Sequence, residues 1–136
     1  MANRRRQAGD YFERRTRDAL EAAAYVVVRS AGSLGPADLV ALKAGAPPML
    51  ISCKMSGKLP RRELMALCDV AEDAGATAVL AQRHKPGWVR LEALSRHGKT
   101  LLGTLHFPPR VPRPRKAREA EPDDPAQLSI YDALAE

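Results

Sequence analysis

Residues 35–54 read GPADLVALKAGAPPMLISCK, and the expected fold is built outward from them. Two apolar runs flank the turn-forming sequence AGAPP at 44–48, a pattern that predicts a β-hairpin. Asp38 stands just before the first run, and Lys54 ends the second. Because the strands of a hairpin are antiparallel, the start of one lies beside the end of the other. The sequence therefore predicts that Asp38 and Lys54 meet at one end of a sheet.

The flanking sequence predicts the other elements from hydrophobic periodicity and turn residues. In chain order these are a helix over 8–24, a strand over 25–28, the hairpin strands 39–43 and 49–54, a helix over 60–74, and strands over 77–82 and 88–94. Pro60 suits the first turn of its helix, and Gly75 suits the C-terminal end. The order α-β-β-β-α-β-β predicts an α/β domain with a mixed sheet flanked by helices.

Charge and composition narrow the classes of function. The 136 residues include 22 Lys and Arg against 16 Asp and Glu, a formal charge of +6 that favours polyanionic partners, nucleic acid first. No apolar run is long enough to span a membrane, and no apolar stretch follows the N-terminal arginines as a signal peptide requires. Two cysteines, Cys53 and Cys68, form neither a disulfide framework nor a four-thiolate zinc site. These features predict a cytoplasmic protein.

Proline and charge divide the chain into three parts. Residues 1–107 are predicted to form the folded domain. Residues 108–126 contain six of the eleven prolines together with several arginines, which predicts an extended basic linker. The last part, 127–136, is amphipathic.

The final segment carries a candidate partner-binding motif. It resembles the peptides with which bacterial proteins bind the sliding clamp, a Gln-Leu pair followed by a small or acidic residue and two large apolar ones. The residues that match are Gln127, Leu128, Ile130 and Tyr131. The alternative is a short helix that packs on its own domain.

Three side chains carry the candidate chemistry: Glu13 in the first helix, Asp38 and Lys54. A carboxylate can hold Mg²⁺, and a lysine beside it can orient an attacking water and offset charge on a phosphate. Taken singly, each residue has an ordinary structural role. Glu13 could pair with Arg17 four residues on, Asp38 could bond its own backbone in a turn, and Lys54 could protect an edge strand.

The order of these residues resembles the PD-(D/E)xK nuclease superfamily, and within it the archaeal-type Holliday junction resolvases. The matching text is FERRTRDAL (12–20), YVVVRS (25–30), GSLGPADLVA (32–41) and ISCK (51–54), followed by the second helix. The resemblance implies a restriction-endonuclease-like fold and a homodimer that cuts branched DNA, such as four-way junctions, with Mg²⁺ or Mn²⁺ as cofactor.

The resemblance also implies roles for single residues. Glu13 and Asp38 would bind the metal with the backbone carbonyl of Cys53, and Lys54 would complete the site. A loop serine would assist, Ser33 first and Ser30 as the alternative.

The sequence departs from the family pattern at two positions. Ala37 separates Pro36 from Asp38, which changes only the loop. Ser52 stands two places before Lys54, where the family has an acid, and a hydroxyl is a poorer Mg²⁺ ligand than a carboxylate. Some restriction enzymes of the superfamily share this Ser-x-Lys pattern and take the acid from the following helix. Glu63 is the first candidate for that acid, ahead of Asp69 and Glu72.

Basic residues form the candidate DNA-binding surface, through phosphates and without base readout. They are Arg4, Arg5, Arg6, Arg14, Arg29, Lys58, Arg61 and Arg62. Two other functions remain open: a general DNA nuclease of the same fold for repair or restriction, and a catalytically impaired junction-binding protein, should no acid replace Ser52.

Overall fold

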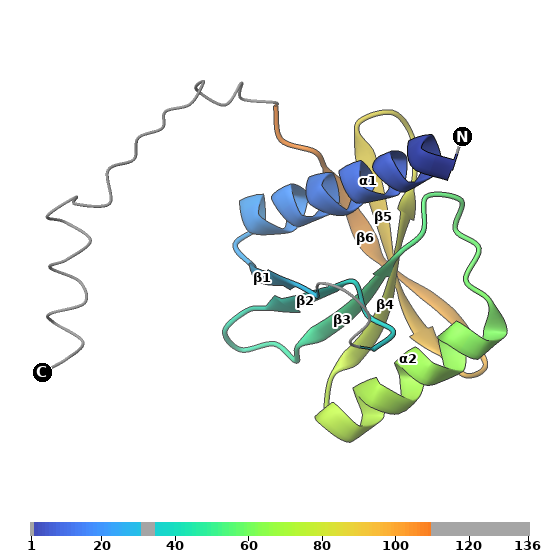
Figure 1. The fold of residues 1–136 in the computed structure, drawn as a ribbon. Helices are drawn as coiled ribbons and strands as arrows, with labels where there is room; N and C mark the ends of the chain where they lie inside the picture. The colour runs from blue at the N-terminus through green and yellow to red at the C-terminus, as the bar shows by residue number, and fades with distance from the viewer. Residues whose placement is uncertain (1, 31–34, 110–136) are drawn as a thin grey trace, which may run out of the picture.

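The computed structural model describes residues 2–30 and 35–109, which form a sheet flanked by two helices (Figure 1). The elements in chain order are α1 (Ala2–Ala22), β1 (Val26–Arg29), β2 (Leu39–Leu42), β3 (Met49–Cys53), α2 (Arg61–Ala74), β4 (Thr77–Arg83), β5 (Trp88–Ser95) and β6 (Gly98–His106). The six strands lie in the sheet in chain order, from β1 at one edge to β6 at the other. The predicted α/β class is confirmed.

The sheet is mixed because one connection differs from the rest. β3 and β4 are parallel and are connected through α2, whereas all the other neighbouring strands are antiparallel. The predicted hairpin of β2 and β3 is confirmed, with Leu39 paired to Ile51. This register places the residue before β2 beside the C-terminal end of β3.

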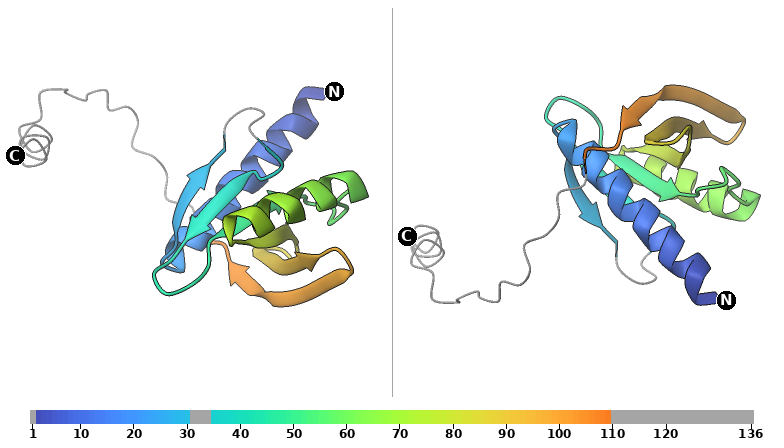
Figure 2. Two further views of the ribbon diagram at one scale, coloured as in Figure 1. Left: turned by 90° about the horizontal axis from the view of Figure 1, so that it is seen from below. Right: turned by 90° about the horizontal axis from the view of Figure 1, so that it is seen from above.

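The helices cover opposite faces of the sheet, as the two views of Figure 2 show. On one face, Phe12 and Leu20 of α1 pack with Ile51 and other buried side chains of the sheet. On the other face, Leu67 and Ala71 of α2 pack with neighbouring strand residues. Both faces of β3 are therefore buried, which explains why its sequence is a continuous apolar run instead of an alternating one.

The predicted ends of α2 agree with the structure to within a residue. Pro60 is the N-cap, and Gly75 ends the helix in the left-handed conformation with φ of 66°. A glycine adopts this conformation at little cost because it lacks a Cβ.

One predicted boundary was wrong, and one strand was missed. α1 begins at Ala2 and not at residue 8, since arginine, alanine and glutamine favour helix even where no apolar stripe marks it. The predicted order also omitted β6, which pairs antiparallel with β5. β6 is an edge strand with mostly exposed side chains, so the hydrophobic alternation that indicates a strand is missing from its sequence.

None of the helices in the described ranges is long and apolar enough to cross a membrane. The C-terminal peptide 127–136 and nearly all of the predicted linker lie outside the described residues.

Candidate active site

The end of β3 holds the carboxylate of Asp38 in a defined position. The backbone N–H of Asp38 donates to the carbonyl of Ile51 at 2.8 Å. Its carboxylate oxygen Oδ2 accepts a hydrogen bond of 2.8 Å from the backbone N–H of Cys53. Ser30, at the end of β1, donates its N–H to the carbonyl of Asp38 at 2.9 Å. Three strands thus fix Asp38 where the sequence predicted it.

Lys54 follows β3 directly and pairs with an acid of α2. Its Nζ lies 3.1 Å from Oε1 of Glu63, in the first turn of the helix. The side chains are 34% and 46% exposed, so a substrate can reach both from solvent. The backbone N–H of Lys54 donates to Ala81 of β4 at 2.9 Å, which continues the parallel pairing one residue beyond the strand. Glu63, the first candidate for the missing acid, therefore lies at the predicted lysine.

Glu13 approaches the site from α1. Burial raises the pKa of Glu13 above its ordinary value, and the charge of Asp38 raises it further, while the hydrogen bond from Arg29 lowers it. That hydrogen bond joins Arg29 Nε to Glu13 Oε1 at 3.2 Å. A like charge favours the uncharged form of a carboxyl group, which is the direction in which the charge of Asp38 acts on Glu13.

Glu13 does pair with an arginine, but the expected partner, Arg17, was wrong. Arg17 pairs with Glu21 at 3.3 Å, and Glu13 pairs with Arg29 of β1. Nη2 of Arg29 also lies 3.5 Å from Asp10, a partner that sequence reasoning missed. The signal for it was the three-residue spacing of Asp10 and Glu13, which puts both on one face of a helix.

Ser52 and Cys53 are the last two residues of β3. Ser52 is buried, with 2% of its surface exposed, in the place where the family has an acid. Burial raises the pKa of the Cys53 thiol, and the charges of Asp38 and Glu13 raise it further. Burial likewise raises the pKa of the Cys68 thiol. Because the thiolate is the reactive form of cysteine, neither residue is suited to act as a nucleophile.

The residues fit a divalent metal through their oxygen atoms. Asp38 and Glu13 supply hard carboxylate ligands of the kind that Mg²⁺ and Mn²⁺ prefer, and a cation between them would relieve their repulsion. Within residues 2–30 and 35–109, no group of three or more His, Cys, Asp or Glu side chains has the arrangement of a metal site. Any further ligand must come from the backbone, a hydroxyl, water or a rearranged acid.

The structure places the other predicted site residues in different surroundings. Ser33 lies outside the described residues, whereas Ser30 contacts Asp38 through its backbone. Arg29, predicted to bind DNA, has its guanidinium occupied by two carboxylates. The other predicted DNA-binding residues are exposed; they are Arg4, Arg5, Arg6, Arg14, Lys58, Arg61 and Arg62. Asp69 and Glu72 both pair with Arg96, so neither replaces Glu63 at Lys54.

Residues 3–101 match the family described as Archaeal holliday junction resolvase (hjc). A solved structure with a similar fold is that of Archaeoglobus fulgidus Hjc, described as a Holliday junction resolvase from an archaeal hyperthermophile. The two share 29% sequence identity with a TM-score of 0.56, and the match covers 68% of this chain and 85% of the Archaeoglobus chain. No curated protein sequence matches the chain.

Proposed function

The chain belongs to the archaeal Holliday junction resolvase (hjc) family, and we propose that it is a metal-dependent endonuclease that cuts four-way DNA junctions. The observation that carries the proposal is the convergence at the end of β3. Asp38 accepts a hydrogen bond from the backbone of this strand, Lys54 follows the strand directly, and the charge of Asp38 helps to raise the pKa of Glu13. A carboxylate pair beside an ammonium group is the set that phosphodiester hydrolysis requires.

Each residue has a chemical task in this proposal. Asp38, Glu13 and the carbonyl of Cys53 would hold Mg²⁺ or Mn²⁺, which would supply positive charge beside the scissile phosphate. Lys54 orients the attacking water and offsets the charge that develops on phosphorus. The water oxygen forms a bond to phosphorus and gives up its proton to solvent, one ester P–O bond breaks, and the leaving oxygen takes up a proton from solvent. Ser33, which lies outside the described residues, is proposed to assist.

Glu63 is proposed to replace the acid that is missing at Ser52. Its carboxylate already lies 3.1 Å from the Lys54 ammonium, near enough to share the site. Ser52 is neutral and buried, so it would offer a metal only its hydroxyl oxygen. One rearrangement of the exposed Glu63 side chain would convert it from the partner of Lys54 into a metal ligand.

Cleavage of defined substrates tests the function against its alternatives. The full chain is incubated with a labelled four-way junction, a linear duplex of the same sequence and single-stranded RNA, with Mg²⁺ or with EDTA. Paired nicks in the junction alone, lost in EDTA, are the expected result. Cleavage of every duplex would instead identify a general nuclease of the same fold. Junction binding without cleavage in the presence of Mg²⁺ would identify a binding protein.

DNA binding is assigned to the exposed basic residues and not to base contacts. Arg4, Arg5, Arg6 and Arg14 lie along α1, and Lys58, Arg61 and Arg62 lie beside Lys54 at the start of α2. Contacts of this kind recognise the phosphate backbone and the shape of the DNA.

A homodimer is proposed to form through the α2 side of β1 and β2. Val26 and Val28 of β1 are 65% and 53% exposed, and Leu42, which pairs with Val26, is 39% exposed. α2 packs on β3, β4 and β5, so this apolar patch is left beside it. A second copy is the occupant that a resolvase needs, because symmetric cuts in two strands require two active sites.

Val28→Asp is expected to convert the dimer into a monomer, since a buried interface does not tolerate an unpaired charge. Light scattering measures the mass, and junction cleavage should fall from paired to single nicks. Leu102→Asp is the matched control, because Leu102 of β6 is similarly exposed, at 49%, on the opposite edge strand. A wild-type chain that is monomeric at the assay concentration would refute the proposal that this patch forms a dimer interface.

The C-terminal peptide remains proposed as a sliding-clamp ligand through Gln127, Leu128, Ile130 and Tyr131. Such a tethered segment binds by placing apolar side chains in a preformed groove. Deletion of residues 127–136 is expected to abolish retention on an immobilised bacterial clamp and to leave junction cleavage unchanged. Equal retention of the truncated and full-length chains would reject this partner.

A further inference from the structure

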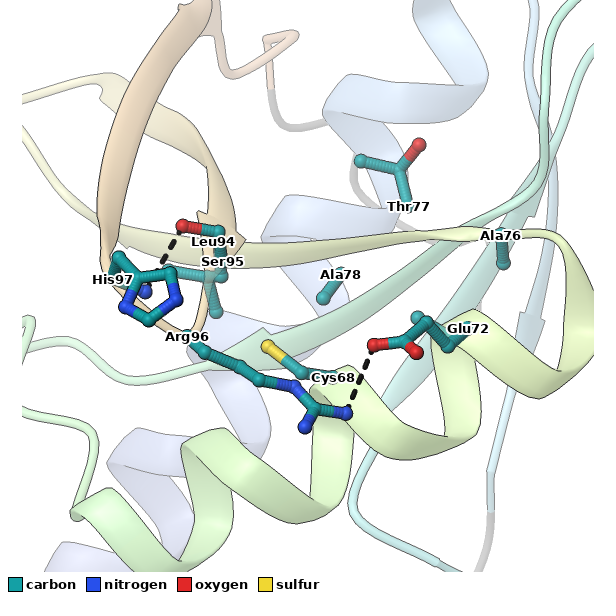
Figure 3. A pocket seen from close by; sticks show the side chains of 10 residues that line it. Cys68, Glu72, Ala76, Thr77, Ala78, Leu94, Ser95, Arg96 and His97 are labelled. Carbon is teal, nitrogen blue, oxygen red and sulfur yellow. Dashed lines mark hydrogen bonds and ion pairs between the residues drawn. The ribbon is translucent and has the colours of Figure 1, made fainter.

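Glu92 is a buried acid in the middle of β5, with 6% of its surface exposed. It stands two residues before Leu94, which packs with the α2 cluster, so both side chains belong to the α2 face of the sheet. Figure 3 shows a contrasting acid of α2, Glu72, whose side chain is 69% exposed where it meets Arg96. Because Glu92 is withdrawn from water, its carboxylate needs partners inside the protein.

Gln82 of β4 is one of these partners. Its Nε2 donates to Oε1 of Glu92 at 2.5 Å. Nη2 of Arg90 lies 3.3 Å from the other carboxylate oxygen, and Nζ of Lys99 lies 3.9 Å from Oε1. A primary amide carries its donor and its acceptor on separate atoms, so the bond to Glu92 leaves the amide oxygen of Gln82 directed elsewhere.

The amide oxygen of Gln82 packs against Gly57, in the loop between β3 and α2. Any side chain at position 57 would place its Cβ on this oxygen. Gly57 also has a φ of 77°, a left-handed conformation that glycine adopts at little cost. Two independent constraints thus require glycine here, and one of them is the Gln82 side chain.

Gly57 closes the turn that begins at Lys54. Its N–H donates to the carbonyl of Lys54 at 2.8 Å, and the N–H of Lys54 donates to Ala81 at 2.9 Å. Gln82 directly follows Ala81, so one segment of β4 holds the Lys54 backbone from both sides. The Lys54 side chain is flexible and 34% exposed, and the position of its ammonium therefore depends on that backbone.

We propose that Gln82 is a positioning residue, which holds Lys54 in place for the reaction through Gly57. The inference rests on the proposed function and adds to it a residue that acts only through Lys54. Glu92 anchors the amide, the amide fixes the turn, and the turn fixes the lysine. Direct binding of DNA does not explain this arrangement, because the Gln82 amide is directed at Glu92 and Gly57 within the protein.

Gln82→Met tests this role, because methionine has a similar length and can neither donate to Glu92 nor place an oxygen on Gly57. Arg90 and Lys99 still neutralise Glu92 in the variant, so the sheet should remain folded, and thermal melting checks this. Single-turnover junction cleavage with Mg²⁺ is expected to fall about tenfold, since small displacements of a reacting group are costly. Junction binding in EDTA should stay within about twofold of wild type. Gln7→Met, the same change at an exposed position of α1, should leave both unchanged.

Combination with Lys54→Met separates positioning from general destabilisation. If Gln82 acts through Lys54, the double variant should cut no more than about twofold more slowly than Lys54→Met alone. A residue that merely stabilises the fold would lower the rate by the same factor in both backgrounds. Full multiplication of the two losses would therefore overturn the proposal.

Hydrogen exchange in the wild-type chain provides a measurement that does not depend on a folded variant. The side-chain amide protons of Gln82 should exchange at least about tenfold more slowly than those of exposed Gln7, because Glu92 accepts one of them. Equal exchange of the two glutamine side chains would show that the contact with Glu92 does not hold Gln82, and would overturn the proposal.

The outcomes separate this inference from the proposed function. A wild-type chain that does not cut junctions overturns the function itself. A wild-type chain that cuts them, with Gln82→Met and Gln7→Met equally fast, overturns only the role of Gln82. A loss of junction binding as large as the loss of cleavage would make Gln82 a binding residue and would also overturn its positioning role.

Discussion

Asp38→Asn is expected to reduce junction cleavage by at least about 100-fold while junction binding stays within about threefold of wild type. The amide oxygen of asparagine can still accept the hydrogen bond from Cys53 N–H that holds the native side chain at 2.8 Å. The local fold should therefore survive, and the change removes mainly one negative charge. A divalent cation at the site depends on that charge.

Single-turnover cleavage of a labelled junction measures this effect, and a gel shift in EDTA measures binding. Asp73→Asn is the matched control, because it makes the same chemical change at an exposed position of α2. Equal cleavage by the Asp38 variant and wild type would place the reaction elsewhere. A large loss of thermal stability would show that Asp38 serves the hairpin instead of the chemistry.

Lys54→Met is expected to reduce cleavage by about 100-fold or more at every metal concentration, because methionine keeps much of the aliphatic side chain and loses only the ammonium. Glu63→Gln provides the comparison, since the two side chains contact each other at 3.1 Å. If Glu63 is a metal ligand, a high concentration of Mn²⁺ should restore much of the activity of the Glu63→Gln variant. The same concentration should restore none of the activity of the Lys54→Met variant.

The two variants together distinguish the roles of the pair. Lys43→Met controls for the loss of a lysine, because Lys43 lies in the β2–β3 turn and donates to the carbonyl of Ala23. Recovery of Lys54→Met at high Mn²⁺ would contradict its proposed work on water and phosphate. A Glu63→Gln variant as active as wild type in Mg²⁺ would remove Glu63 from the ligand set.

Local sequence signals were sufficient for much of the fold. The hairpin of β2 and β3 followed from two apolar runs around a glycine- and proline-containing turn, and the ends of α2 followed from Pro60 and Gly75. Because hairpin pairing is antiparallel, the same signal brought Asp38 to the end of β3. The missed elements, the start of α1 and β6, are those with exposed side chains and no hydrophobic period.

The contacts of the candidate site were less accessible to sequence reasoning. The sequence shows that Arg29 is basic. Its ion pairs with Glu13 and Asp10, however, depend on how α1 crosses β1. The choice of Glu63 over Asp69 and Glu72 depends on which side of α2 faces Lys54 and which faces Arg96.

For this chain, short-range information specified the elements, the hairpin and the residue types that can hydrolyse a phosphodiester. Such information is local because periodicity, turns and caps act over a few residues. The partners of each charge were set by packing: α1 and α2 approach the sheet from opposite faces, and the residues they bring together come from distant parts of the chain. Electrostatic interactions depend on separation in space, and folding alone defines that separation.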